Sequence, residues 1–279
     1  MEVGVMLGWL HILALAAIQG LTGILPLSET GFLTIGRKLM GLPLNGSGDR
    51  FYGALTQLTL TLVICVVFRR DLTACIGLRR KKSRRRADVY QSEGELNHRM
   101  FLLILIAILP MLFTLLLQRR TAALGENLPA VTGMFLLNGL IIFVCDRVGH
   151  GRRALAEATI ADSLLLGFAL TLSVVPGLSG MAVAITVGII RGLSPAFCVR
   201  FSCLLLIPLY LIRGLVQLVS TMGTVRFSPL YLIGMIVCGI CCYFALWLLR
   251  FMAKRGTLSE FSYIAWGASL FTFCVYLFS

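Results

Sequence analysis

Two polar loops interrupt long apolar stretches of this sequence and carry side chains that could contact an anion. The first lies in QGLTGILPLSETGF, residues 19–32, and the second in SVVPGLSGM. Unwound helix starts expose backbone N–H groups that bind anions, and Gly and Ser let a phosphate approach closely. Both loops are therefore candidate phosphate sites, although the same patterns also fit plain tight turns. The loop residues of interest are Ser28, Glu29, Thr30, Gly177 and Ser179.

Two charged residues near apolar segments extend this chemistry. Glu29 occupies the tip of the first loop, and a carboxylate at membrane depth indicates a base or a metal ligand. Alternatively, Glu29 has no role in chemistry and lies near the outer surface, where water solvates it. Arg213 lies within a later apolar stretch and could supply a cation to the loops, or else extend its side chain to the membrane interface.

The composition identifies a membrane protein. Of 279 residues, 58% are apolar and 13% are charged, and the mean hydropathy is +0.92. Several apolar stretches exceed the 18 or so residues that cross a hydrocarbon core. The net charge of +13 does not indicate nucleic-acid binding, because the basic run RRKKSRRR at 79–86 separates two apolar segments, as cytoplasmic anchors do. We expect a multi-pass membrane protein.

The order of apolar blocks predicts the fold. Each half of the chain has one broken block followed by three plain spans, which predicts an all-α polytopic membrane protein with an inverted repeat, residues 1–147 and 148–279. In each half, a re-entrant helical hairpin precedes three transmembrane helices. The hairpins are expected at 4–41 and 155–191, and the spans at 51–68, 100–118, 130–146, 197–219, 229–249 and 259–278.

The positions of Lys and Arg favour re-entrant hairpins. If each hairpin returns to the side that it left, the linkers with most of the 25 Lys and Arg residues lie inside. These linkers are 69–99, 146–155, 191–200 and 250–258. If the hairpins crossed the membrane instead, residues 146–155 would lie outside while 69–99 stayed inside.

Three stretches carry a resemblance to a known family. QGLTGILPLSETGF resembles EGLTEFLPVSSTGH, the first signature of the bacterial undecaprenyl-diphosphatase (bacitracin-resistance) family. VVPGLSGMAVAITVGIIRGLS resembles that family's second signature, which is built around PGFSRSG. RFYGALTQLTLTLVICVVFRRDL resembles its F-x-x-x-x-Q segment and places Gln57 on the family's Gln. The likeness extends over nearly the whole chain and implies a multi-pass protein of the bacterial plasma (inner) membrane.

The resemblance implies a lipid substrate. Members remove the terminal phosphate of undecaprenyl diphosphate, which recycles the lipid carrier for cell-wall synthesis, and a divalent metal assists them. The implied partners are a polyprenyl phosphate or diphosphate and the membrane lipids, with no nucleic acid; a homo-oligomer remains one alternative for the assembly. The positions implied to contact substrate are Gln19, Ser28, Thr30, Gln57, Gly177 and Ser179, to which the charge pattern adds Arg213.

This chain departs from the family at the positions that carry the charge. Gly23 replaces an acid, Glu29 replaces a serine, Phe32 replaces the His and Gly180 replaces the Arg. Phosphoryl transfer needs the phosphate charge to be neutralised and the nucleophile to be oriented by a base. A Gly or Phe supplies neither function.

Three functions stay open. The first is a relative that acts on or binds the carrier lipid without the family's ordinary diphosphatase activity. The second is an active diphosphatase with a rearranged site, in which Glu29 and Ser28 are catalytic and a divalent metal is the expected cofactor. The third is an anionic-lipid transporter or a non-catalytic regulator.

Overall fold

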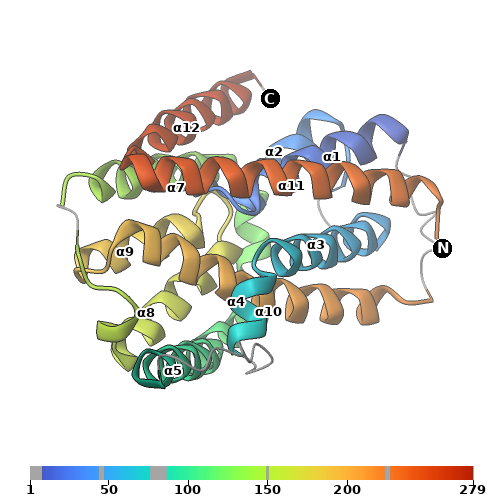
Figure 1. Cartoon of the computed structure of the whole chain (residues 1–279). Helices are drawn as coiled ribbons and strands as arrows, with labels where there is room; N and C mark the ends of the chain where they lie inside the picture. Colours follow the sequence, from blue (N-terminus) through green and yellow to red (C-terminus); the bar gives the residue numbers. More distant parts are fainter. Residues whose placement is uncertain (1–7, 44–46, 76–86, 149–150, 224–226, 279) are drawn as a thin grey trace.

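The fold is entirely helical over the part of the chain that the structure describes. The computed structural model describes residues 8–43, 47–75, 87–148, 151–223 and 227–278. Within these ranges the elements are α-helices and short 3₁₀ turns, with no β-strand (Figure 1). The all-α architecture predicted from the sequence is confirmed. The basic run at 79–86, which we expect to be a cytoplasmic anchor, lies outside the described residues.

Six helical segments are long and apolar enough to cross a membrane, by length and composition. They coincide with the six plain spans expected from the sequence. These segments are α3 (Ser47–Val67), α5 (Ala87–Met111) with α6 (Phe113–Thr121), α7 (Leu128–Cys145), α10 (Pro195–Thr221), α11 (Leu230–Arg255) and α12 (Phe261–Phe278).

The two broken blocks form hairpins of shorter helices. Of their four α-helices the longest has 14 residues, about 21 Å at 1.5 Å per residue, which is less than the roughly 30 Å of a hydrocarbon core. Re-entrant hairpins fit that length, whereas the inverted-repeat relation between the halves stays a prediction. The hairpin elements are α1 (Trp9–Thr22), α2 (Glu29–Leu39), α8 (Ile160–Thr171), η3 (Leu172–Val174) and α9 (Gly180–Ile190).

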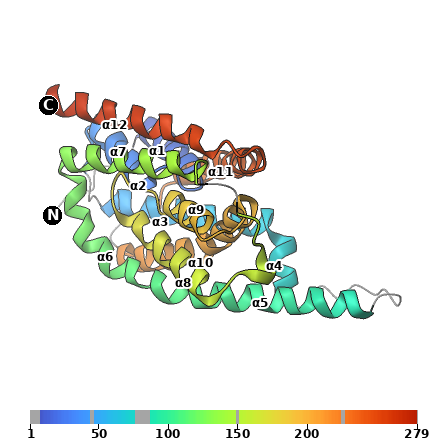
Figure 2. The same ribbon diagram turned by 90° about the vertical axis from the view of Figure 1, so that its left-hand side faces the viewer.

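The helices pack in pairs that join distant parts of the chain. Helix α3 packs on α10, α7 on α12, α1 on α11, and α5 on α8 (Figures 1 and 2). Small residues permit the close pairs: a Cβ at Gly20 would lie 2.5 Å from the carbonyl oxygen of Cys238, so α1 and α11 almost touch. The remaining short elements are α4 (Arg69–Cys75), η1 (Ala122–Gly125), η2 (Leu155–Glu157) and η4 (Leu258–Glu260).

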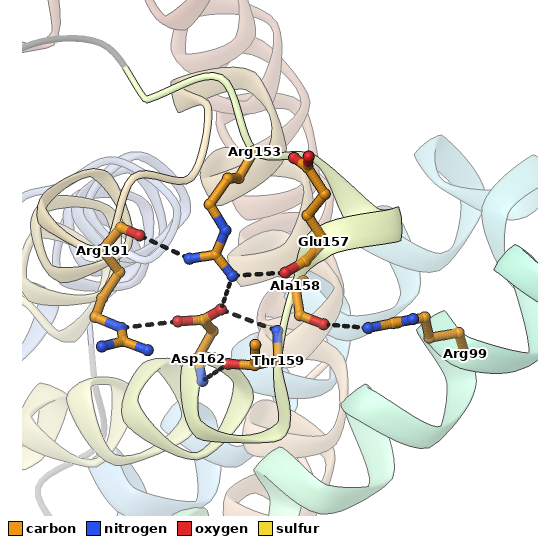
Figure 3. Close-up of polar contacts among 7 residues, drawn as sticks. All are labelled: Arg99, Arg153, Glu157, Ala158, Thr159, Asp162 and Arg191. Atoms are coloured by element: carbon orange, nitrogen blue, oxygen red, sulfur yellow. Dashed lines mark hydrogen bonds and ion pairs between the residues drawn. The ribbon is translucent and has the colours of Figure 1, made fainter.

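A buried aspartate joins the two ends of the second hairpin. Asp162, at the start of α8 and 1% exposed, accepts a hydrogen bond from Arg153 Nη2 and one from Arg191 Nε, each at 2.8 Å (Figure 3). Burial opposes the charged form, but the hydrogen bonds from Thr159, Arg191 and Arg153 outweigh it and lower the pKa of Asp162 to about 2. The two ends of the second hairpin, at Arg153 and Arg191, therefore lie next to each other.

Contacts among the linkers place them on one face of the protein. The backbone N–H of Arg153 donates to the carbonyl oxygen of Gly192. Arg200 forms an ion pair with Asp71. The described linker residues around Arg153, Gly192, Arg200 and Asp71 thus share a side, as the prediction of re-entrant hairpins expects. We call this side the basic face.

Candidate functional site

The two polar loops meet, and Ser28 is the residue that joins them most directly. Its hydroxyl oxygen accepts hydrogen bonds from the backbone N–H of Gly31 at 3.1 Å and of Gly177 at 2.9 Å. The first bond caps the N-terminus of α2, and the second reaches across to the other half of the chain. The Ser28 side chain is fully buried.

Asn138 on α7 provides a second link between the loops. Its Nδ2 donates to the carbonyl oxygen of Pro26 at 3.3 Å, and its Oδ1 accepts from the backbone N–H of Ser179 at 2.9 Å. Thr30 adds a third link, because its hydroxyl lies 3.2 Å from the carbonyl oxygen of Ser173. The sequence pointed to neither residue: Asn138 is an isolated polar residue on α7 that bonds to the backbone of both loops, and Ser173 acts through its own backbone carbonyl, which any residue would supply.

A cavity of about 170 Å³ adjoins these loops, where α3 begins and α10 ends. Among the residues expected from the sequence, five line it: Gln19, Glu29, Thr30, Gln57 and Arg213. The other three, Ser28, Gly177 and Ser179, are not part of its wall. The Ser179 hydroxyl oxygen instead accepts the N–H of Ala182 and caps α9. Ser28 and Ser179 therefore hold the loops in shape.

Glu29 is buried in the wall of the cavity and held from two sides. Glu29 is 6% exposed, so the alternative of a water-solvated side chain at the outer surface is wrong. Its Oε1 accepts from Gln19 Nε2 at 3.0 Å, and its Oε2 accepts from the Tyr210 hydroxyl at 2.9 Å. Gln19 is held in turn by the Thr56 hydroxyl, which donates to its Oε1 at 2.6 Å. This chain of hydrogen bonds fixes the carboxylate in one orientation.

Arg213 is buried with unused hydrogen-bond donors. Its side chain is 5% exposed, so extension to the membrane interface is excluded. Its Nε and Nη1 have no hydrogen-bond partner among the residues that the structure describes. Leaving a buried polar group unpaired costs about 1–3 kcal/mol, and more for a charged one. A guanidinium in the wall of a cavity with free donors suits a phosphate, which accepts two parallel N–H bonds.

Further charges surround the cavity. Arg37 Nε lies 2.8 Å from Asp49 Oδ2 in an ion pair, and Arg50 is exposed at the same wall. Three arginines thus outnumber two carboxylates, which favours an anionic ligand. Helical spacing could have revealed two of these residues, because Arg37 follows Glu29 by eight positions on α2 and Arg50 precedes Gln57 by seven on α3.

The side chains do not fit a dedicated divalent-metal site. The described residues contain no cluster of three or more His, Cys, Asp or Glu. Of the two carboxylates at the cavity, Asp49 is paired with Arg37 and Glu29 is engaged by Gln19 and Tyr210. Hard cations such as Mg²⁺ prefer several oxygen ligands, and neighbouring guanidinium groups repel them.

These features define a class of protein: an all-α membrane protein in which two broken helical hairpins meet beside a cationic cavity. Residues 12–271 match the family described as bacitracin resistance protein BacA, and the chain belongs to this family.

Similar proteins carry one name, undecaprenyl-diphosphatase. The protein from Anaeromyxobacter dehalogenans (strain 2CP-C) is 29% identical over 255 residues, which cover 89% of this chain and 84% of that protein. The one from Mycobacterium sp. (strain KMS) is 27% identical over 261 residues, 90% of each chain. The one from Pseudarthrobacter chlorophenolicus is 31% identical over 218 residues, 76% of this chain and 75% of that protein.

Proposed function

We propose that this protein binds the diphosphate head group of a polyprenyl lipid carrier in the cavity beside its two loops, and that it does so without the family's ordinary hydrolysis. The observation that carries the proposal is the buried guanidinium of Arg213, which lines the cavity with unpaired donors. The names of the relatives supply the ligand class, because a diphosphatase must bind a diphosphate.

The wall of the cavity offers the contacts that a diphosphate needs. Arg213 donates to one phosphate from the base of the cavity, and Arg50 neutralises the second from its exposed position on α3. Gln57 on α3 also lines the cavity and adds side-chain hydrogen bonding. Charge-assisted bonds of this kind are worth about 1.5–3 kcal/mol each. The polyprenyl tail stays among the apolar spans.

The family's hydrolytic groups have no counterpart at their own positions. Gly180 carries no charge, and Phe32 packs edge-on against Phe135 with ring centroids 5.2 Å apart. The Ser28 hydroxyl, a candidate nucleophile, is fully buried and accepts two backbone N–H groups. Nucleophilic catalysis requires an accessible hydroxyl beside a base, and this one does not reach the cavity.

A second candidate function rests on the carboxylate of Glu29. Because Glu29 lines the cavity in a fixed orientation, it is placed to accept a proton from a water molecule that attacks the terminal phosphorus. The P–O bond to the bridging oxygen then breaks, and the products are inorganic phosphate and the lipid monophosphate. Arg213 would neutralise the charge that develops on the phosphate oxygens.

Binding of a short-chain prenyl diphosphate, measured by calorimetry on the purified protein in detergent, tests the proposal. Arg213→Gln is expected to weaken binding by about tenfold to a hundredfold, equivalent to the 1.5–3 kcal/mol above. The variant should remain folded, because the replaced donors have no partner among the described residues. The matched control is Arg147→Gln, which removes an exposed arginine that lies over the Phe143 ring. Equal affinity of Arg213→Gln and wild type would refute the proposal.

A phosphate-release assay on undecaprenyl diphosphate separates the two functions. The first proposal expects binding without turnover, with or without divalent metal. Turnover that disappears in Glu29→Gln would establish the second function instead, because Gln keeps the shape of the side chain and cannot take a proton.

A further inference from the structure

A second, larger groove lies at the basic face, at the opposite end of α3 from the diphosphate cavity, and its other walls are α4 and α11. Its volume is about 720 Å³. Gly53 lines the diphosphate cavity and Val66 lines this groove, 13 residues further along α3 or about 20 Å at 1.5 Å per residue. The groove is lined by Val66, Val67, Arg69, Arg70, Asp71, Tyr243, Leu246, Trp247, Arg250, Phe251 and Lys254.

One face of α11 provides a wall that changes from apolar to basic. Tyr243, Trp247, Arg250 and Lys254 follow at steps of four, three and four residues, which places them in one row along the helix. The Tyr243 and Trp247 side chains are 63% and 54% exposed, as expected on a helix face that contacts lipid. Arg250 and Lys254 occupy the last turns of the helix, at the basic face.

The basic end of the groove has an excess of cations. Arg69 and Arg70 on α4 line it together with Arg250 and Lys254 on α11. Its single carboxylate, Asp71, already forms an ion pair with Arg200. Arg250 lies over the Phe68 ring, 4.2 Å from the centroid, so this guanidinium is held in place. Among the described residues, no carboxylate pairs with Arg69, Arg70, Arg250 or Lys254.

We propose that this groove binds one anionic glycerophospholipid from the leaflet at the basic face. The phosphate lies among Arg69, Arg70 and Lys254, and an acyl chain runs along Tyr243 and Trp247. Charge complementarity selects the anion, and each cation near a membrane surface contributes about 1 kcal/mol. The apolar half selects a lipid over a soluble phosphate, because its residues belong to helices long enough to span the bilayer.

Fluorescence of Trp247 reports on the proposed lipid directly. The protein is reconstituted in zwitterionic vesicles that contain a small fraction of lipid with brominated acyl chains, either phosphatidylglycerol or phosphatidylcholine. Quenching is measured for the protein and for Trp247→Phe, and the difference isolates Trp247 from Trp9 and Trp266. Brominated phosphatidylglycerol is expected to quench Trp247 at least twice as strongly as brominated phosphatidylcholine at the same fraction.

Charge-removing variants distinguish lipid binding in this groove from a general attraction between anionic lipid and the cations of the basic face. Arg70→Gln with Lys254→Gln should reduce the preference for phosphatidylglycerol by half or more. The matched control, Arg147→Gln with Arg152→Gln, removes two exposed cations from another linker of the basic face and should leave the preference unchanged. Equal quenching by the two lipids, or an equal loss in both double variants, would overturn the proposal. Because the groove shares no residue with the diphosphate cavity, its failure leaves the proposed function intact.

Discussion

Replacing Ser28 with Ala tests whether one hydroxyl joins the two loops. The Ser28 oxygen accepts buried N–H groups from Gly31, in its own loop, and from Gly177, in the other. Removing an acceptor leaves each buried donor unpaired at a cost of about 1–3 kcal/mol. With two donors and incomplete additivity, we expect the free energy of unfolding to fall by about 2–4 kcal/mol.

The measurement is reversible unfolding of the purified protein by SDS titration in mixed micelles. Ser179→Ala is the matched control, because the Ser179 hydroxyl caps α9 through Ala182 alone and does not reach the first loop. Loss of that helix cap should cost about 1 kcal/mol. If Ser28→Ala costs no more than Ser179→Ala, the bond between Ser28 and Gly177 does not stabilise the fold, and the joining role is wrong.

Three further predictions concern the support of the loops. Gly180→Arg, which introduces the family's residue, should lower stability by more than about 2 kcal/mol, because a Cβ there would lie 2.7 Å from the carbonyl oxygen of Leu170; wild-type stability in a thermal-unfolding assay would contradict this. Asn138→Ala should cost about 2–4 kcal/mol in SDS titration, because it leaves the Ser179 N–H and a buried carbonyl unpaired; an unchanged midpoint would refute it. The lowered pKa of Asp162 means that its stabilising effect is complete above about pH 4 and is lost as the pH falls towards 2; the stability advantage over Asp162→Asn should shrink across that window, and a constant difference would show that the charge is not responsible.

The number and order of the spans could be predicted from the sequence because the thickness of the hydrocarbon core fixes how long an apolar run must be. The charges of the linkers predict a re-entrant form for the second hairpin, and the contact between Arg153 and Gly192 agrees with this prediction. The loops could be recognised because Gly, Pro and Ser interrupt those apolar runs. These signals are local in the chain, so a single sequence carries them.

The composition of the cavity could be predicted only in part. Arg37, Asp49 and Arg50 lie at the ends of apolar blocks, where charged residues ordinarily contact water. Their convergence depends on how α2, α3 and α10 are aligned, and helix register is set by packing that no local pattern specifies. Likewise, the burial of Arg213 follows from its position against α3, because a cation in an apolar span can equally reach the interface.

The departures from the family's signatures are coordinated in space. A Cβ at Gly23, where the family has an acid, would lie 3.2 Å from the Tyr210 hydroxyl oxygen, and that hydroxyl donates to Glu29. The Gln19 carbonyl oxygen and the Leu60 side chain lie closer still, at 2.8 and 2.9 Å, so the space of the lost acid is filled by several neighbours, among them the residue that holds Glu29. Tyr210 and Arg213 are three positions apart on α10 and share a face, so one helix supports the carboxylate and supplies the cation. Restoring one family residue should consequently not restore the family's site, because neighbours on α1, α3 and α10 lie against Gly23 and the backbone of α8 lies against Gly180.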